Sequence, residues 1–257
     1  MLLVVDVGNT NIVFGIFNGE ELVHDWRMNS DKSKSSDEYG MFFLEVLNHA
    51  NIKPAEISDV IVSSVVPNIM YTLENTIFKY FNKQPLIVGA GIKTGLNIRY
   101  DNPKEVGADR IVNAVSVVQR YGGPAIIIDI GTAITFCVID KHENYCGGMI
   151  VPGIGISSEA LFTRTSKLPK VEILKPQEIV GKNTVSSMQS GLYYGFSSMI
   201  DGIVDHICQD LKLSSKDVHI IATGGFASLL VGDSRHDIII ERDLTLDGLR
   251  RIFELNR

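Results

Sequence analysis

Two similar stretches decide the fold of this chain: Leu2-Leu3-Val4-Val5-Asp6-Val7-Gly8-Asn9-Thr10 and Ala125-Ile126-Ile127-Ile128-Asp129-Ile130-Gly131-Thr132. In each stretch a run of aliphatic residues, typical of a buried strand, ends at a carboxylate and a glycine. A second apolar run follows each of them, at residues 12–17 and 134–139. The pattern predicts a duplicated β-hairpin in which Asp6 and Asp129 stand next to the turns.

The residues at both turns suit a bound phosphate. Glycine allows a backbone N–H to approach a phosphate oxygen closely, and the neighbouring Asn and Thr side chains add hydrogen-bonding groups. A carboxylate beside a phosphate requires a cation between them. One Asp-x-Gly turn would be ordinary turn chemistry. Two copies with matched strands favour a metal–nucleotide complex bound by two related halves.

Length and composition agree with two halves. The chain has 257 residues, of which 45% are hydrophobic, enough for one large core or two modest ones. We expect domains at residues 1–117 and 118–257. Helical and strand patterns alternate, which predicts an α/β fold. The expected helices cover residues 36–49, 69–81, 106–121, 184–211 and 246–255, and the further strands cover 21–27, 59–66, 85–88, 147–151, 218–222 and 238–241.

Charge and composition exclude several classes of protein. The formal net charge is −6 and no Lys/Arg-rich run occurs, so we expect no nucleic-acid partner. The first residues lack the basic region of a signal peptide, and no apolar run reaches the roughly 20 residues of a membrane span, so we expect no membrane association. Three cysteines without metal-ligand spacing favour the reducing cytoplasm and core positions for all three.

Familiar catalytic patterns of other enzymes are missing from the sequence. The six histidines form no metal-binding pair, no serine has the flanking glycines of a nucleophile elbow, and no Gly-x-x-x-x-Gly-Lys-Ser/Thr run exists. A serine hydrolase and a P-loop kinase are therefore excluded as interpretations.

The order of motifs resembles the actin-like phosphotransferase superfamily, in which two duplicated ribonuclease H-like domains bind ATP in the cleft between them. Within it, the chain is similar to type III pantothenate kinases over nearly its whole length. The resemblance rests on the following segments: Asp6 to Asn11, Asn102-Pro103, Val106 to Arg110, Asp129 to Ala133, Gly147 to Gly153, Asn183 to Gly191, Thr223-Gly224-Gly225 and Leu244 to Leu249.

This resemblance implies a kinase that phosphorylates pantothenate to 4′-phosphopantothenate with ATP, the first step of coenzyme A biosynthesis. It implies nucleotide binding by Asp6, Val7, Gly8, Asn9, Thr10, Asn11, Ile12, Val13 and Thr132. Asp6 would hold Mg²⁺ directly or through water, and Asp129 a monovalent cation, K⁺ or NH₄⁺. Glycines at 224 and 225 are expected either to face adenosine or to form a plain strand-to-helix turn.

The resemblance also assigns the acceptor side of the reaction. Asp109 is expected to be the general base that accepts the proton of the attacking hydroxyl. Pantothenate itself would be bound by Tyr100, Gly107, Ala108, Asp109, Arg110 and Thr184. Without the paired loops, the segment around Asp109 would be interpreted as a helix N-terminus with a favourable acidic residue.

Two other interpretations remain open, together with the assembly state. A non-catalytic transcription-accessory regulator on the same scaffold would bind nucleotide without turnover, and a sugar or acyl kinase would accept another hydroxyl or carboxylate. The helix expected at 184–211 has glycines within its apolar stripe, which suggests close packing against another backbone. The resemblance favours a homodimer there, whereas the periodicity alone fits a core helix equally well.

Overall fold

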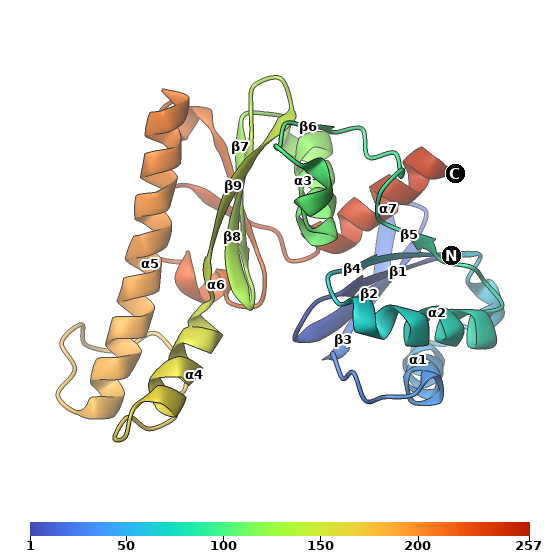
Figure 1. The fold of residues 1–257 in the computed structure, drawn as a ribbon, viewed down its shortest axis with the longest axis horizontal. Coiled ribbons are helices and arrows are strands. Elements are labelled where there is room, and N and C mark those ends of the chain that lie inside the picture. The colour runs from blue at the N-terminus through green and yellow to red at the C-terminus, as the bar shows by residue number, and fades with distance from the viewer. The chain divides into compact units, whose positions relative to one another are not determined.

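The computed structural model describes all residues from Met1 to Arg257. They form two compact units. The first consists of Met1–Leu96, Asp101–Ser116 and Asp243–Arg257, and the second of Asn97–Tyr100 and Val117–Arg242. Helix α3 (Ala108–Tyr121) begins in the first unit and ends in the second. Each unit is built on its own β-sheet (Figure 1).

The first sheet has the strand order β3-β2-β1-β4-β5. Strand β1 lies in the middle, antiparallel to its hairpin partner β2 and parallel to β4. Its side chains are buried on both faces of the sheet, which is why an almost continuous aliphatic run forms this strand. The strands are β1 (Leu2–Val7), β2 (Asn11–Asn18), β3 (Glu21–Asn29), β4 (Asp59–Ser64) and β5 (Leu86–Ile87).

The second sheet repeats this order. Its strands run β11-β10-β7-β8-β9-β6, so that β7 takes the place of β1 and β10 that of β4. Strand β6, a two-residue strand that the sequence pattern did not indicate, adds to the outer edge of β9. The strands are β6 (Asn97–Ile98), β7 (Ala125–Ile130), β8 (Ala133–Ile139), β9 (Asn144–Pro152), β10 (His219–Thr223) and β11 (Ile238–Ile240). The expected duplicated α/β fold is confirmed.

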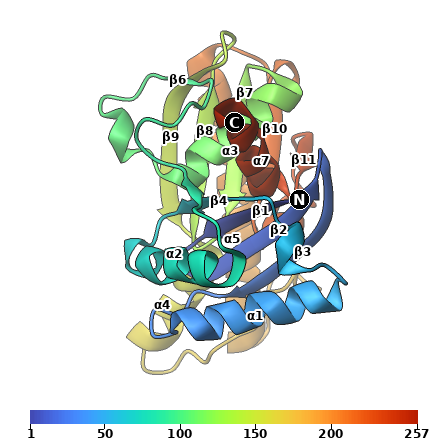
Figure 2. The same ribbon diagram turned by 90° about the vertical axis from the view of Figure 1, so that its right-hand side faces the viewer.

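Helices cover both faces of the first sheet. Helices α1 (Ser36–His49) and α2 (Pro67–Phe81) bury one face, while α7 (Leu244–Asn256) and the start of α3 bury the other (Figure 2). Helix α1 begins at a capping box formed by Ser35 and Glu38, which satisfies two backbone N–H groups of the first turn. The helix therefore starts where its sequence predicts.

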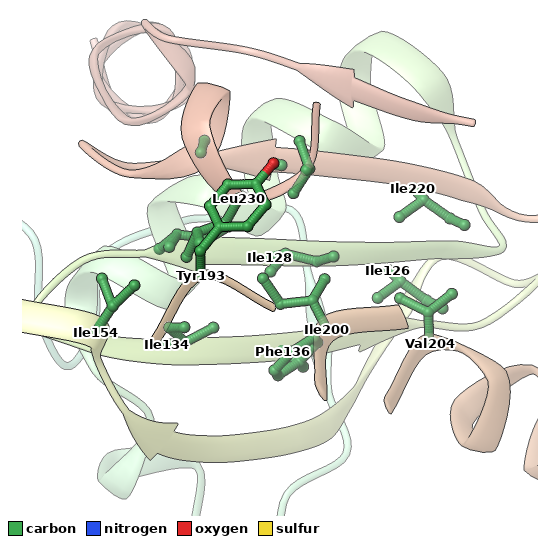
Figure 3. Close-up of a cluster of buried hydrophobic side chains, with 14 of the residues drawn as sticks. Ile126, Ile128, Ile134, Phe136, Ile154, Tyr193, Ile200, Val204, Ile220 and Leu230 are labelled. Atoms are coloured by element: carbon green, nitrogen blue, oxygen red, sulfur yellow. The ribbon is translucent and has the colours of Figure 1, made fainter. Parts of the chain in front are cut away.

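In the second unit, α4 (Ile154–Arg164), the long α5 (Thr184–Leu211) and the short α6 (Ala227–Leu230) pack on one face of the sheet. Aliphatic side chains of β7, β8 and β10 meet the inner side of α5 in one buried cluster (Figure 3). Each aliphatic side chain buried in this way stabilises the unit by roughly 1.5–3 kcal/mol relative to exposure. No helix of the chain is long and apolar enough to cross a membrane.

The C-terminal helix lies in a different unit from the one expected. The expected boundary between residues 117 and 118 assigns this helix to the second domain. In the structure α7 packs on β1 and β4 of the first unit. Its stripe of Leu246, Leu249 and Ile252 joins Leu2 and Val4 in one buried cluster. The reason is that α1 and α2 leave the other face of the first sheet uncovered, and the apolar stripe of α7 buries it.

Close packing between α7 and α3 depends on one glycine. A Cβ atom at Gly248 would overlap the backbone carbonyl of Val112. Gly248→Ala should therefore destabilise the protein by about 1–3 kcal/mol, because the two helices must move apart. Thermal and urea unfolding followed by circular dichroism measure this. Gly202, inside α5 with open space around its Cβ position, is the matched control: Gly202→Ala should stabilise by up to about 1 kcal/mol. Equal stability of the two variants would contradict the packing argument.

Candidate active site

The loop after β1 is a tight turn held by its own backbone. The Gly8 N–H donates to the Asn11 carbonyl at 2.9 Å, and a Cβ on Gly8 would lie 3.1 Å from that oxygen. Asn9 and Thr10 are exposed at the tip. Val7 and Ile12 are paired across the hairpin, and both residues are 0% exposed.

A residue beyond β3 clamps this loop. The Ser30 N–H donates to the Thr10 carbonyl at 2.9 Å, and the Ser30 hydroxyl donates to the Gly8 carbonyl at 2.5 Å. Two carbonyls of the turn are thereby bound from one side. We infer that Ser30 fixes the turn in a single conformation, which a loop that binds phosphate through its N–H groups requires.

Asp6 itself has a buried neighbour on the adjacent parallel strand. Asp6 and Ser63 stand opposite each other in the register of β1 and β4. The hydroxyl of Ser63, which is 0% exposed, donates to Oδ1 of Asp6 at 2.6 Å. The carboxylate at the strand end is thus oriented by the sheet itself.

The equivalent loop of the second unit is also held by backbone groups and is more tightly enclosed. The Gly131 N–H donates to the Ala133 carbonyl at 3.1 Å, and the Gly153 N–H donates to the Thr132 carbonyl at 3.0 Å. A Cβ atom on Gly153 would overlap the carbonyl oxygens of both Gly131 and Thr132. Gly153, the residue before α4, is therefore required for the helix to start against this loop.

The Gly224-Gly225 turn lies against the end of β7. Gly224 has φ of +95°, and a Cβ there would come within 2.6 Å of the Ile130 carbonyl. Both the left-handed backbone and the close approach require glycine at this position. The strand-to-helix turn by itself therefore explains why residue 224 is glycine. Contact of this turn with adenosine stays a prediction.

Asp109 is the second residue of α3, and its carboxylate folds back onto the start of the helix. Its Oδ1 accepts a hydrogen bond from the Arg110 N–H at 2.8 Å. A Cβ on Gly107 would lie only 2.5 Å from the same oxygen, so glycine makes room for the carboxylate. Arg110 is buried, with 7% of its surface exposed.

The surroundings of Asp109 alter its protonation. Burial raises the pKa of the Asp109 carboxyl above its ordinary value, and hydrogen bonds from backbone N–H groups together with the Arg110 charge oppose the shift. A carboxylate with a raised pKa is a stronger base than an exposed one. The helix start therefore carries a carboxylate suited to accepting a proton.

Tyr100 and Thr184 belong to the second unit. The ring of Tyr100 lies over Gly147, where a Cβ would be 3.5 Å away and where φ is +117°. Thr184 is the exposed first residue of α5, after the N-cap Asn183, whose Oδ1 accepts from the Ser186 N–H at 2.9 Å. It lines an open groove of about 640 Å³ between α4 and α5.

The expected site residues are thus divided between the units. The loop from Asp6 to Asn11 and the segment from Gly107 to Arg110 belong to the first unit, and Tyr100, Asp129, Thr132 and Thr184 to the second. Sequence reasoning missed Ser30 and Ser63. Ser63 carried a signal, because a serine within the aliphatic stretch of β4 needs a buried partner. Ser30 carried no such signal, because it lies in a polar segment where a serine is expected.

The raised pKa of Asp109 has a consequence for stability. A carboxyl with a higher pKa in the folded chain than in the unfolded chain destabilises the fold as pH rises through the interval between the two values. Asp109→Asn keeps an acceptor for the Arg110 N–H without the buried charge. We expect this variant to unfold at a higher temperature than the wild type at neutral pH, with a difference that shrinks on acidification.

Thermal unfolding measured at several pH values checks this expectation. Asp25→Asn, which removes an exposed carboxylate from β3, is the control and should change little. A variant at position 109 that is less stable than the wild type at every pH would show that the charged carboxylate stabilises the fold.

Comparisons of the sequence with known proteins identify its family. The sequence model of the type III pantothenate kinase family matches residues 2–206. A type III pantothenate kinase of Geobacillus kaustophilus (strain HTA426) is 52% identical over 256 residues, covering 100% of this chain and 98% of the relative.

Solved structures with low identity share the fold. A conserved Baf family transcriptional activator from Campylobacter jejuni, itself described as putative, superimposes with a TM-score of 0.62 at 18% identity, covering 99% of this chain and 98% of the other. A 2-dehydro-3-deoxygalactonokinase from Sinorhizobium meliloti, also described as putative, superimposes with a TM-score of 0.63 at 9% identity, covering 100% of this chain and 96% of the other. From the family match and the full-length relative, the chain belongs to the type III pantothenate kinase family.

Proposed function

We infer that this protein transfers the γ-phosphoryl group of ATP to the primary hydroxyl of pantothenate, giving 4′-phosphopantothenate at the entry to coenzyme A biosynthesis. Family membership supports the reaction. The place of the chemistry is supported by the half-buried Asp109 carboxylate at the start of α3, whose pKa is raised by desolvation.

Asp109 acts as the general base. Phosphoryl transfer needs an acceptor hydroxyl held in line with the γ-phosphate and a group that takes its proton. The hydroxyl proton passes to the Asp109 carboxylate as the oxygen attacks phosphorus. Gly107, Ala108 and Arg110 bind the substrate beside it, because the first N–H groups of a helix and a guanidinium both attract polar oxygens. Tyr100 and Thr184 complete the pantothenate contacts.

The phosphates of ATP are bound by the loop from Asp6 to Val13 and by Thr132. Backbone N–H groups at the tip of the first turn and the side chains of Asn9, Thr10 and Asn11 supply the donors. Asp6 holds Mg²⁺ directly or through water. No group of three or more His, Cys, Asp or Glu side chains surrounds a metal site, and a single carboxylate fits an ion that keeps its waters and shares the nucleotide phosphates. Mg²⁺ neutralises phosphate charge during transfer.

Asp129 binds a monovalent cation, K⁺ or NH₄⁺. The sheet register places Thr135 of β8 and Thr223 of β10 opposite Asp129, on either side of it. Residues directly opposite one another point to the same face, so three oxygen-bearing side chains stand in one row. Oxygen ligands suit a hard cation better than nitrogen or sulfur does.

The enzyme is a homodimer whose copies meet at the α4 and α5 groove. Gly191 and Gly195 stand one turn apart on the exposed side of α5 with open space at their Cβ positions. The same two helices carry exposed apolar side chains, including Phe162 at 46% and Val185 at 43%. Small residues one turn apart allow a second backbone to approach, and a second copy supplies it. We place the dimer in the cytoplasm, since no disulfide joins any of Cys137, Cys146 and Cys208.

A coupled ADP-release assay tests the function. Protein, ATP, Mg²⁺ and K⁺ should release ADP with pantothenate and not with glucose or acetate, and omission of K⁺ and NH₄⁺ should abolish turnover. Asp109→Asn should lower kcat by about 100-fold or more. Nucleotide binding without turnover for any acceptor would support the non-catalytic regulator instead. ADP release with glucose or acetate alone would support a sugar or acyl kinase.

Light scattering after gel filtration tests the dimer. Gly195→Arg should give a monomer, because an arginine fills the space that a second backbone needs. Gln209→Arg, on an exposed position of the same helix, is the charge-matched control and should leave the mass unchanged. If both variants form dimers, the interface does not lie at the α4 and α5 groove.

A further inference from the structure

Ser63 has no part in the activity described so far, yet it is the most enclosed polar residue near the first loop. It is 0% exposed and lies in β4, a strand whose preceding residues Val60, Ile61 and Val62 are buried and apolar. Its hydroxyl donates to Oδ1 of Asp6 at 2.6 Å. A buried hydroxyl costs about 1–3 kcal/mol unless it is hydrogen-bonded, so an apolar residue would be the simpler choice for a core position.

The second unit has the same arrangement of residues. Thr223 occupies in β10 the place that Ser63 has in β4, opposite Asp129 in the register of the parallel pair, and it is 4% exposed. Each strand-end carboxylate therefore has a buried hydroxyl residue beside it on the neighbouring parallel strand. Core packing alone does not require a hydroxyl at the same register position twice.

A hydrogen bond to one carboxylate oxygen limits rotation of the side chain. Asp6 is the next-to-last residue of β1, beside the hairpin turn, and is partly exposed. An aspartate side chain has several staggered rotamers, among which a hydrogen bond can select. Donation from Ser63 to Oδ1 selects the rotamers that keep this oxygen against β4. Removing a residue that hydrogen-bonds to a metal ligand commonly lowers the affinity for the metal by about 10- to 100-fold.

We propose that Ser63 is a positioning residue that holds the Asp6 carboxylate in the orientation needed for the Mg²⁺–ATP complex. This inference rests on the proposed role of Asp6. Ser63 acts through Asp6 and touches neither substrate.

The test compares Ser63→Ala with a control of the same chemistry. Ser116 is also 0% exposed, and its hydroxyl donates to a carboxylate oxygen of Asp247, likewise at 2.6 Å, within the first unit. Ser116→Ala therefore removes an equivalent buried hydrogen bond at another place. Asp6→Asn is the third variant. For each protein, calorimetry measures binding of Mg²⁺–ATP without pantothenate, and steady-state assays measure half-saturating Mg²⁺ and KM for pantothenate. Thermal unfolding followed by circular dichroism measures the unfolding temperature.

We expect Ser63→Ala to weaken Mg²⁺–ATP binding and raise half-saturating Mg²⁺ by about tenfold, with KM for pantothenate unchanged. Ser116→Ala should lower the unfolding temperature by a comparable amount without changing the Mg²⁺ requirement. If Ser63→Ala loses only stability, as the control does, while Asp6→Asn weakens Mg²⁺–ATP binding, the positioning role is wrong and Asp6 keeps its function. If Asp6→Asn also binds Mg²⁺–ATP as the wild type does, the proposed role of Asp6 fails as well.

Discussion

The register between a hairpin strand and the parallel strand beside it is the constraint on which each unit depends. In the first unit β1 pairs with β4 so that Asp6 meets Ser63, and in the second β7 pairs with β10 so that Asp129 meets Thr223. A slip by one residue would turn every side chain of the strand to the other face. The same pairing that buries the aliphatic residues therefore fixes where each carboxylate stands.

Close backbone approaches bring the remaining loops up to these strand ends. Gly153 lets α4 start against the loop at Thr132, and Gly224 lets the turn after β10 pass the carbonyl of Ile130. In the first unit Ser30 performs the clamping through hydrogen bonds instead of close packing. The two loops thus share a scaffold and differ in how they are held.

Helix α3 carries Asp109, the general base that we propose, and packs against a distant part of the chain. Its first turn presents Asp109, and its packing surface is completed by α7, whose Gly248 lies against the Val112 carbonyl. A second contact between them joins the Thr245 hydroxyl to Asn113 Oδ1 at 2.7 Å. Residues at the end of the sequence therefore stabilise the helix that carries Asp109.

The sequence by itself determined the duplicated hairpins, the alternation of helices and strands, and the boundaries of long elements such as α5, because periodicity and turn chemistry act over neighbouring residues. It also indicated the family, through motifs at Asp6, Asp109 and Asp129. Only the tertiary structure decided that α7 belongs to the first unit, that Ser63 and Ser30 donate hydrogen bonds to Asp6 and Gly8, and that Cys146 is exposed while Cys137 and Cys208 are buried. These contacts join residues far apart in the chain, such as Asp6 and Ser63, and they form only once the sheets and their covering helices are packed.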